Sequence, residues 1–141
     1  MNNRLKFRVW SKTRQQYIEK DSPRCYLNYD GELDCCYLTD TKDVECIYEP
    51  YPEDDLIYEQ CTGLRDKNGK LIYEGDIVNI FCCRHPYGYL GRTKGNVYWS
   101  NPDAEFRIKV SLEEEYNLYG IEIEVIGNIN ENPELLEKSD E

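Results

Sequence analysis

The chain has 141 residues, of which 40% are hydrophobic and 13% aromatic, and its formal net charge is −11. This length allows one folded domain with a core, or a small domain with an appendage. The acidic balance disfavours a protein that coats duplex nucleic acid, because such proteins gain most of their affinity by neutralising phosphates. No apolar run approaches the ~20 residues that cross a bilayer, so no membrane-spanning helix is expected.

The charge is unevenly distributed. Residues 1–20 carry a net charge of +5, residues 21–60 of −10, residues 61–110 of +3 and residues 111–141 of −9. The first ten residues lack the apolar core and cleavage site of a secretory signal. The seven cysteines are odd in number and include two adjacent pairs. We therefore expect a cytoplasmic protein with reduced thiols that serve as small apolar residues.

The first predicted element is a β-hairpin over residues 4–19. Leu5, Phe7 and Val9 alternate with basic residues, which is the two-residue period of a half-buried strand. The polar segment 11–14 predicts the turn. The basic outer face is typical of a solvated strand edge.

Residues 20–56 form an acidic region of different character. They hold three of the six prolines and show no sustained helical period, which indicates an insertion with weak strands. The Asp30-Gly31 pair predicts a hairpin over residues 25–38. A short helix is expected around residues 40–48.

The segment 60–81 has the strongest strand and turn signals. The pair Asn68-Gly69 separates two extended stretches, and it is typical of a type I′ turn because both residues tolerate positive φ. A second reversal is predicted at residues 73–76, where Asp76 is expected to accept backbone N–H groups. The β-branched and aromatic run 77–81 predicts a buried strand.

The C-terminal part again shows short strands separated by turns. A loop rich in glycine and tyrosine is expected at residues 82–95, followed by strands at 97–99, 106–110 and 121–125. The acidic segment 112–120 is expected to be a connection without regular structure.

Asn132 followed by Pro133 predicts a short C-terminal helix, because asparagine is a favoured N-cap and proline a favoured first helical residue. Five short strands within residues 61–130 indicate a small barrel or roll. The predicted fold class is mainly β. The predicted domains are residues 1–57, a β-hairpin plus a variable acidic region, and residues 58–141, a barrel that ends in the helix.

Four segments, in this order along the chain, together resemble the YopX family of phage and prophage proteins. They are LKFRVW (5–10), QCTGLRDKNGK (60–70), IYEGDIV (72–78) and IEVIGNINENPELL (123–136). The resemblance implies an SH3-like β-barrel or roll in the C-terminal half. It implies no catalytic residues, because the family is functionally uncharacterised and the matching positions are turn glycines, strand hydrophobics and a helix cap.

The segment Cys82-Cys83-Arg84-His85 contains the single histidine of the chain. A zinc site usually needs four ligands, often from paired Cys-x-x-Cys motifs that this sequence lacks. Neighbouring residues on a loop seldom form a nucleophile–base pair. We expect no metal, no cofactor and no catalytic residue here. The acidic segment 113–115 is expected to form a solvated loop.

The candidate binding surface lies within residues 84–99, where basic and aromatic residues mix without an acidic one. Such a mixture can stack bases and hold phosphates, hold a proline-rich or acidic peptide in an SH3-like groove, or cover the end of the barrel or a sister subunit. The candidate residues are Arg84, His85, Tyr87, Tyr89, Arg92, Lys94, Tyr98 and Trp99.

The expected function is that of a non-enzymatic phage or prophage accessory protein, which acts as a protein-binding module in the bacterial host cytoplasm. Its partner would be a host or phage protein, and homo-oligomers are also expected because half-buried tyrosines suit interfaces. The alternative is a protein that binds single-stranded nucleic acid through the 84–99 loop and the basic N-terminal hairpin.

Overall fold

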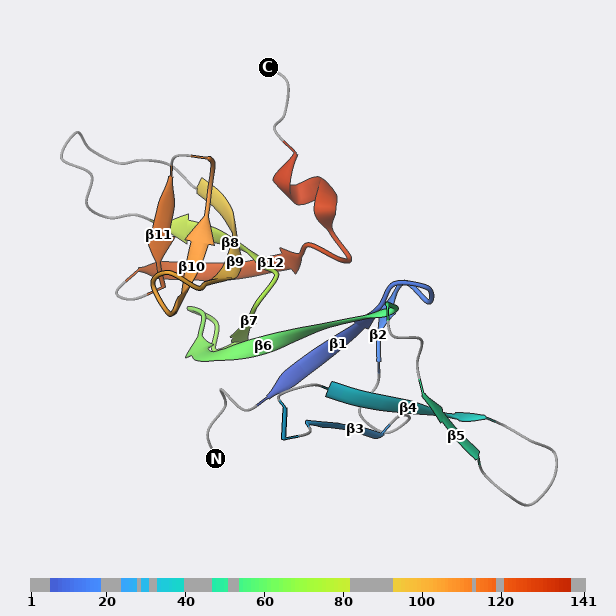
Figure 1. Cartoon of the computed structure of the whole chain (residues 1–141). Helices are drawn as coiled ribbons and strands as arrows, with labels where there is room; N and C mark the ends of the chain where they lie inside the picture. The colour runs from blue at the N-terminus through green and yellow to red at the C-terminus, as the bar shows by residue number, and fades with distance from the viewer. Residues whose placement is uncertain are drawn as a thin grey trace, which may run out of the picture. The chain divides into compact units, whose positions relative to one another are not determined.

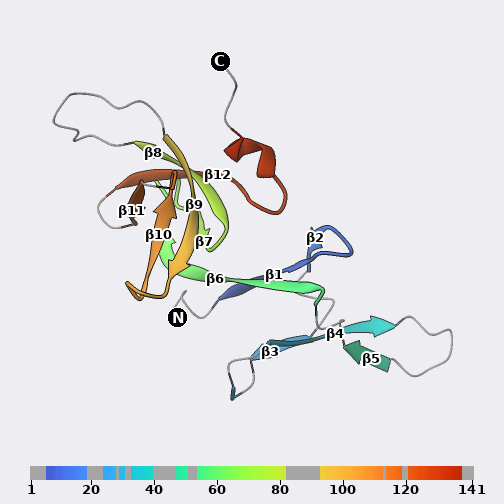
Figure 2. The ribbon, with the colours of Figure 1, turned by 45° about the horizontal axis from the view of Figure 1, so that its top comes forward.

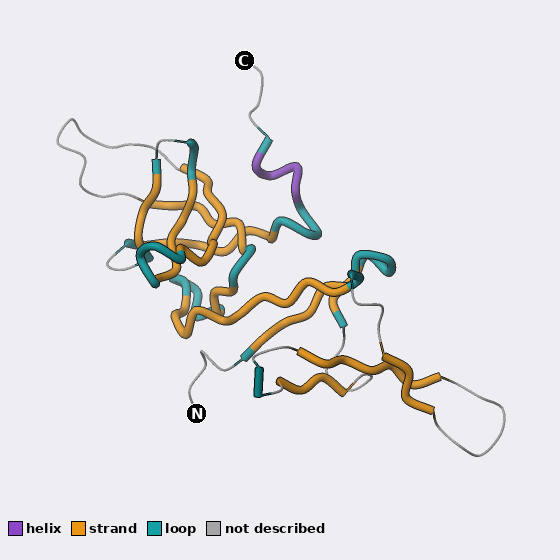
Figure 3. Tube along the Cα trace, viewed as in Figure 1, coloured by secondary structure: helices purple, strands orange, loops and turns teal. Residues whose placement is uncertain are grey.

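The computed structural model describes residues 6–18, 24–27, 29–30, 33–39, 47–50, 54–81, 93–112, 114–118 and 121–137. In these ranges nearly all regular structure is β-strand, with one short helix near the C-terminus (Figures 1 and 3). The predicted mainly-β class is confirmed. The chain divides into two compact units, Arg8–Tyr58 and Met1–Phe7 with Glu59–Glu141. Each unit is described by itself.

The N-terminal β-hairpin is confirmed. Strand β1 (Phe7–Ser11) pairs in antiparallel fashion with β2 (Gln16–Tyr17), and Trp10 lies opposite Tyr17. Their rings meet edge to face with centroids 5.0 Å apart, a favoured aromatic geometry. The turn spans residues 12–15.

Burial in β1 departs from the predicted alternation, because Val9, Trp10 and Ser11 are all buried. Ser11 is buried as a hydrogen-bond donor: its Oγ lies 2.7 Å from Asp55 Oδ2. The second oxygen of the same carboxylate accepts the Thr13 N–H at 2.7 Å. Hydrogen bonds from Thr13 and Ser11 lower the pKa of Asp55 below its ordinary value, as expected when donors favour the charged form.

The acidic region contains a three-stranded antiparallel sheet in the order β3-β4-β5. The predicted hairpin is confirmed, since β3 (Arg24–Leu27) pairs with β4 (Leu33–Thr39). The prediction of a helix around residues 40–48 is wrong for its last two residues, because they belong to strand β5 (Ile47–Pro50), which pairs with β4. β-Branched and aromatic residues at positions 47 and 48 fit a strand. Residues 40–46 lie outside the described ranges.

The larger unit holds a five-stranded antiparallel sheet in the order β11-β10-β9-β8-β12, which curls into a half-barrel (Figure 2). Its strands are β8 (Asp76–Phe81), β9 (Thr93–Ser100), β10 (Glu105–Lys109), β11 (Glu115–Asn117) and β12 (Glu122–Asn128). The SH3-like assignment within the mainly-β class stays a prediction.

Two strand predictions in this sheet need correction. Strand β9 begins at Thr93, several residues before the predicted start. Strand β11 lies inside the segment expected to be an irregular connection. The reason is cross-strand pairing: Glu115 lies opposite Lys109 of β10, and opposite charges on facing positions stabilise a sheet.

The core fills one face of the curled sheet. It comprises buried aliphatic side chains from several strands, with partly buried aromatic and aliphatic residues packed around them. The buried members are Ile72, Val78, Ile80, Val97, Ile108, Leu118 and Ile123. Cys61 is also fully buried with a free thiol, as predicted for a cysteine that serves as a small apolar residue.

Strands β6 (Leu56–Arg65) and β7 (Leu71–Tyr73) form the predicted hairpin. The turn between them is not type I′. Only Gly69 of the Asn-Gly pair has positive φ, at 83°. The Gly69 N–H donates to Asp66 O at 3.0 Å, and the Asp66 N–H donates to Lys70 O at 2.8 Å, the pattern of a three-residue loop with a left-handed glycine.

The side chain of Asp66 explains this choice of turn. Its Oδ1 accepts the N–H groups of Asn68 and Lys70, each at 2.9 Å. Its Oδ2 accepts the Val125 N–H of β12 at 2.9 Å, and the Lys67 N–H donates to Ile123 O at 3.0 Å. We call this set of bonds the Asp66 clamp. It holds the turn against β12 and satisfies groups that strand pairing leaves unmet.

The second predicted reversal is confirmed between β7 and β8. Asp76 Oδ2 accepts the Tyr73 N–H at 2.8 Å, which is the role expected for this aspartate. Gly75 has φ of 83° and is buried. Its N–H donates to Val97 O at 2.8 Å and its carbonyl accepts the Ile129 N–H at 2.9 Å.

The C-terminal helix is a single 3-10 turn, η2 (Pro133–Leu136), with Pro133 at its start as predicted. The predicted side-chain cap is wrong: Asn132 makes no cap hydrogen bond. Its Oδ1 instead accepts the Asn128 N–H at 3.4 Å. The pairing of β12 with β8 is irregular between Val125 and Gly127. A Cβ on Gly127 would lie 2.7 Å from the Asn132 oxygen, so the segment before the helix can approach β12 closely because residue 127 has no side chain.

Candidate functional site

Most of the predicted binding surface falls outside the described residues. This applies to Arg84, His85, Tyr87, Tyr89 and Arg92, and also to the adjacent cysteines 82 and 83. The structure places the other three candidates, Lys94, Tyr98 and Trp99, on strand β9.

Strand geometry separates these three residues. Successive side chains of a strand point to opposite faces, so Lys94 and Tyr98 share one face and Trp99 lies on the other. Val97 is buried in the core, which identifies the face of Trp99 as the core face. The grouping of all three on one surface ignored the alternation of the predicted strand 97–99, which puts neighbouring residues on opposite faces. The structure brings only Lys94 and Tyr98 to the same side.

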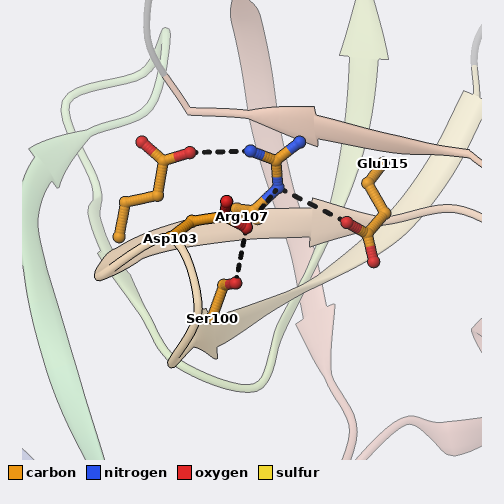
Figure 4. A network of polar contacts seen from close by, with 5 residues as sticks. Ser100, Asp103, Arg107 and Glu115 are labelled. Carbon is orange, nitrogen blue, oxygen red and sulfur yellow. Dashed lines mark hydrogen bonds and ion pairs between the residues drawn. The ribbon is translucent and has the colours of Figure 1, made fainter.

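The face that carries Tyr98 holds a charged network (Figure 4). Arg107 of β10 lies opposite Tyr98. Arg107 contacts three carboxylates: Nη1 lies 2.7 Å from Glu105 Oε1, and Nε lies 3.4 Å from Glu115 Oε2 and 3.9 Å from Asp103 Oδ2.

The turn before β10 is fixed by the same network. Ser100 Oγ donates to Asp103 Oδ2 at 2.7 Å, so Asp103 is oriented from both sides. The hydrogen bond with Glu105 raises the pKa of Arg107 above its ordinary value. One guanidinium thus meets three carboxylates, so the network itself carries more negative than positive charge.

Tyr98 is part of the same arrangement. Its phenol donates a hydrogen bond to Glu115, and this bond, with desolvation and the nearby negative charge, raises the pKa of Tyr98 above its ordinary value of 10.0. Glu115→Gln is expected to bring that pKa back toward the ordinary value, because a neutral amide removes the charged acceptor. NMR titration of ring-labelled tyrosine measures it. An unchanged Tyr98 titration would contradict the hydrogen bond, and Glu114→Gln is the control.

Trp99 is the exposed aromatic residue among the three. Its side chain remains 42% exposed although it lies on the core face, because it stands near the end of β9. Its ring meets Phe106 edge to face, with centroids 4.9 Å apart and planes at 72°. Its indole Nε1 donates to Asn101 Oδ1 at 2.9 Å. The ring is therefore held in place while one side faces solvent.

Several carboxylates of the larger unit have structural partners. Glu74 Oε1 accepts the Gln60 N–H at 3.1 Å, and Asp76 serves the turn. Glu115 belongs to the Arg107 network rather than to a free acidic loop, and Glu113 is outside the described residues. Among the described residues, no three His, Cys, Asp or Glu side chains gather as around a metal ion.

The sequence analysis did not identify two buried acids of the larger unit. Asp66 is 8% exposed and Glu59 is 3% exposed. Asn130 Nδ2 donates to Glu59 Oε1 at 3.2 Å, which ties β6 to the turn after β12. Aspartate before Asn-Gly is a turn signal in sequence, but nothing in the sequence pairs Glu59 with a residue 71 positions away.

These observations define a small acidic β protein with one anchored, exposed tryptophan and a charged sheet face. Within the described ranges, no helix has the length and apolarity that crossing a bilayer requires. The YopX family profile, described as YopX protein, matches residues 6–137. The chain therefore belongs to the YopX family.

Solved structures agree with this membership. The chain is similar to protein EF1440 from Enterococcus faecalis, with a TM-score of 0.60 and 26% identity over 94% of this chain and 97% of that chain. It is also similar to protein yopX from Bacillus subtilis, with a TM-score of 0.64 and 23% identity over 97% of this chain and 100% of that chain. At 23% identity the latter likeness shows the fold alone. No curated protein matches the sequence.

Proposed function

We propose that the chain is a non-enzymatic phage or prophage accessory protein that binds another protein in the host cytoplasm. The observation that carries this proposal is the exposed ring of Trp99. Tryptophan is enriched at interfaces and among the few residues that dominate their energy. The contacts with Phe106 and Asn101 hold the ring before any partner arrives, so little side-chain freedom is lost on docking.

The polar groups around the ring favour a protein partner. The indole N–H is already bonded to Asn101, so Trp99 offers mainly its apolar surface. The net charge of the chain, −11, works against a nucleic-acid partner, because such binding depends largely on neutralising phosphates.

The proposal is tested by affinity capture from host lysate with three immobilised proteins: wild type, Trp99→Ala and Leu112→Ala. Leu112 is the control because it is also a large apolar side chain, 93% exposed. We expect one stoichiometric protein on the wild type and on Leu112→Ala. Its affinity for Trp99→Ala should fall about tenfold or more, as for an interface hot spot.

Nuclease treatment and light scattering separate the alternatives. Captured material that nuclease removes, with binding that weakens steeply with salt, would replace this proposal by the single-stranded nucleic-acid binder. Equal capture by Trp99→Ala and wild type would show that Trp99 is not the anchor. A homo-oligomer of wild type that Trp99→Ala dissociates would assign the ring to self-association.

A further inference from the structure

The Asn68-Gly69 turn has a chemical property that its structural role does not use. We propose that this turn is a site of spontaneous deamidation, and that the resulting isoaspartate releases the Asp66 clamp from β12. The inference is independent of the proposed partner binding. It rests on the exposure of Asn68, the open space around Gly69 and the hydrogen bonds of Asp66.

The two reacting groups are adjacent and accessible. Asn68-Gly69 is the one Asn-Gly pair in the sequence, and both residues are exposed. The Asn68 side-chain amide makes a long contact, 3.5 Å from Nδ2 to Glu124 Oε1. No atom lies within 4 Å of the position that a Cβ on Gly69 would take. Glycine thus places no side chain in the way of its own backbone nitrogen.

The reaction needs only water and base. The Gly69 backbone nitrogen, after loss of its proton to solvent, attacks Cγ of Asn68 and forms a five-membered imide. The Cγ–Nδ2 bond breaks and the nitrogen leaves as ammonia, with a proton from water. Water then adds to one of the two imide carbonyls. Attack at the main-chain carbonyl breaks its bond to the Gly69 nitrogen, and the chain then runs through Cβ and Cγ as isoaspartate.

The Asp66 clamp controls how fast this happens. The Gly69 N–H is bonded to Asp66 O at 3.0 Å, and the Asn68 N–H is bonded to Asp66 Oδ1 at 2.9 Å. These bonds fix the nitrogen in the turn, so attack on Cγ requires the turn to open. The rate of deamidation in the folded protein therefore reports on the opening of the clamp.

The isoaspartate product disturbs the turn because it lengthens the main chain. Isoaspartate inserts a methylene between the N–H groups of residues 68 and 70, which both bond to Asp66 Oδ1. They can no longer share one acceptor in the same geometry, and the Oδ2 bond to Val125 is strained with them. The new carboxylate lies near the cations Arg65, Lys67 and Lys70 of the hairpin and near two acids, Asp66 and Glu124 of β12. The added negative charge by itself should therefore have little effect on the stability of the turn.

The test incubates the full chain at mildly alkaline pH and follows residue 68 by peptide mass mapping and by isoaspartate-specific methylation. Wild type is expected to convert at Asn68 faster than at any other described asparagine. Asn68→Gln, which cannot close a five-membered ring through its side chain, should not convert. Asp66→Ala should convert about tenfold faster, since the Asn68 N–H then loses its charged acceptor.

Hydrogen exchange at the Val125 amide tests the consequence. Aged wild type should exchange there faster than fresh protein, whereas Asn68→Asp, which adds the charge without the methylene, should resemble fresh protein. No conversion at Asn68 in folded wild type, while the urea-unfolded chain converts, would overturn the site. Unchanged Val125 exchange in protein that contains isoaspartate, or an equal conversion rate in Asp66→Ala and wild type, would overturn the link to the clamp.

Discussion

Gly75→Ala is expected to destabilise the larger unit by about 3–5 kcal/mol, combining left-handed backbone strain with overpacking. The residue has φ of 83°, a conformation that costs an L-residue with a side chain. Its Cβ would also collide with the carboxylate of Glu59 and stand 2.9 Å from Glu59 Cδ. Glu59 has little room to retreat, because it is 3% exposed and bonded to Asn130.

Gly69→Ala is the matched control for this prediction. Gly69 has the same φ of 83°, but no atom lies within 4 Å of the Cβ position. The Gly69→Ala variant should lose about 1–2 kcal/mol of unfolding free energy from backbone strain alone. Hydrogen exchange of β8 and β9 amides measures the stability of this unit without assuming that the whole chain unfolds in one step. Equal losses for the two variants would show that the approach of Glu59 to Gly75 is unimportant.

Asp66→Ala is expected to be the second most damaging substitution, with a loss of about 3–4 kcal/mol, because it leaves three N–H groups without their charged acceptor. The donors are those of Asn68, Lys70 and Val125. Asp66→Asn is the intermediate control. Its single carbonyl oxygen can still serve the turn, but its amide nitrogen cannot accept from Val125. Exchange at the Val125 amide should therefore rise in both variants, whereas exchange at Lys70 should rise mainly in the alanine variant.

The same aspartate predicts a pH dependence. Desolvation raises the pKa of Asp66, but the N–H groups of Val125, Lys70 and Asn68 outweigh it, so the pKa lies below its ordinary value of 3.8. A carboxyl with a lower pKa in the folded state stabilises the fold above its unfolded pKa, and this contribution is lost as pH falls through the folded pKa. The stability difference between wild type and Asp66→Asn should hold at neutral pH and shrink in acid below 3.8. A difference independent of pH would contradict the clamp.

The charged face and the exposed ring have different physical roles. On the face of Tyr98, Arg107 lies among three carboxylates, which suits a network that aligns β9, β10 and β11. Trp99 lies on the opposite face and retains exposed apolar surface. The proposed partner binding therefore involves Trp99, whereas the Arg107 network has a structural role. The proposed capture experiment with Trp99→Ala tests the first assignment directly.

Local patterns in the sequence were sufficient for the mainly-β class and for most strands. Alternation identified the segments that became β10 and β12, and the Asp30-Gly31 and Asn68-Gly69 pairs identified two hairpins, because these signals act within a few residues. The family resemblance was visible for the same reason, since its segments are turns and strands. The Arg84–Arg92 part of the predicted surface lies outside the described residues and stays a prediction.

Only the tertiary structure decided the rest. The turn at Asn68-Gly69 is a three-residue loop because Asp66 binds Val125, 59 positions away, as well as its own neighbours. Strand β11 forms because Glu115 meets Lys109 and Arg107 across the sheet. Tyr98 and Trp99 point to opposite faces of β9, and only the burial of Val97 shows that the face of Trp99 is the one that carries the core. Sequence determines local conformation, whereas contacts between distant residues determine which faces and partners each side chain receives.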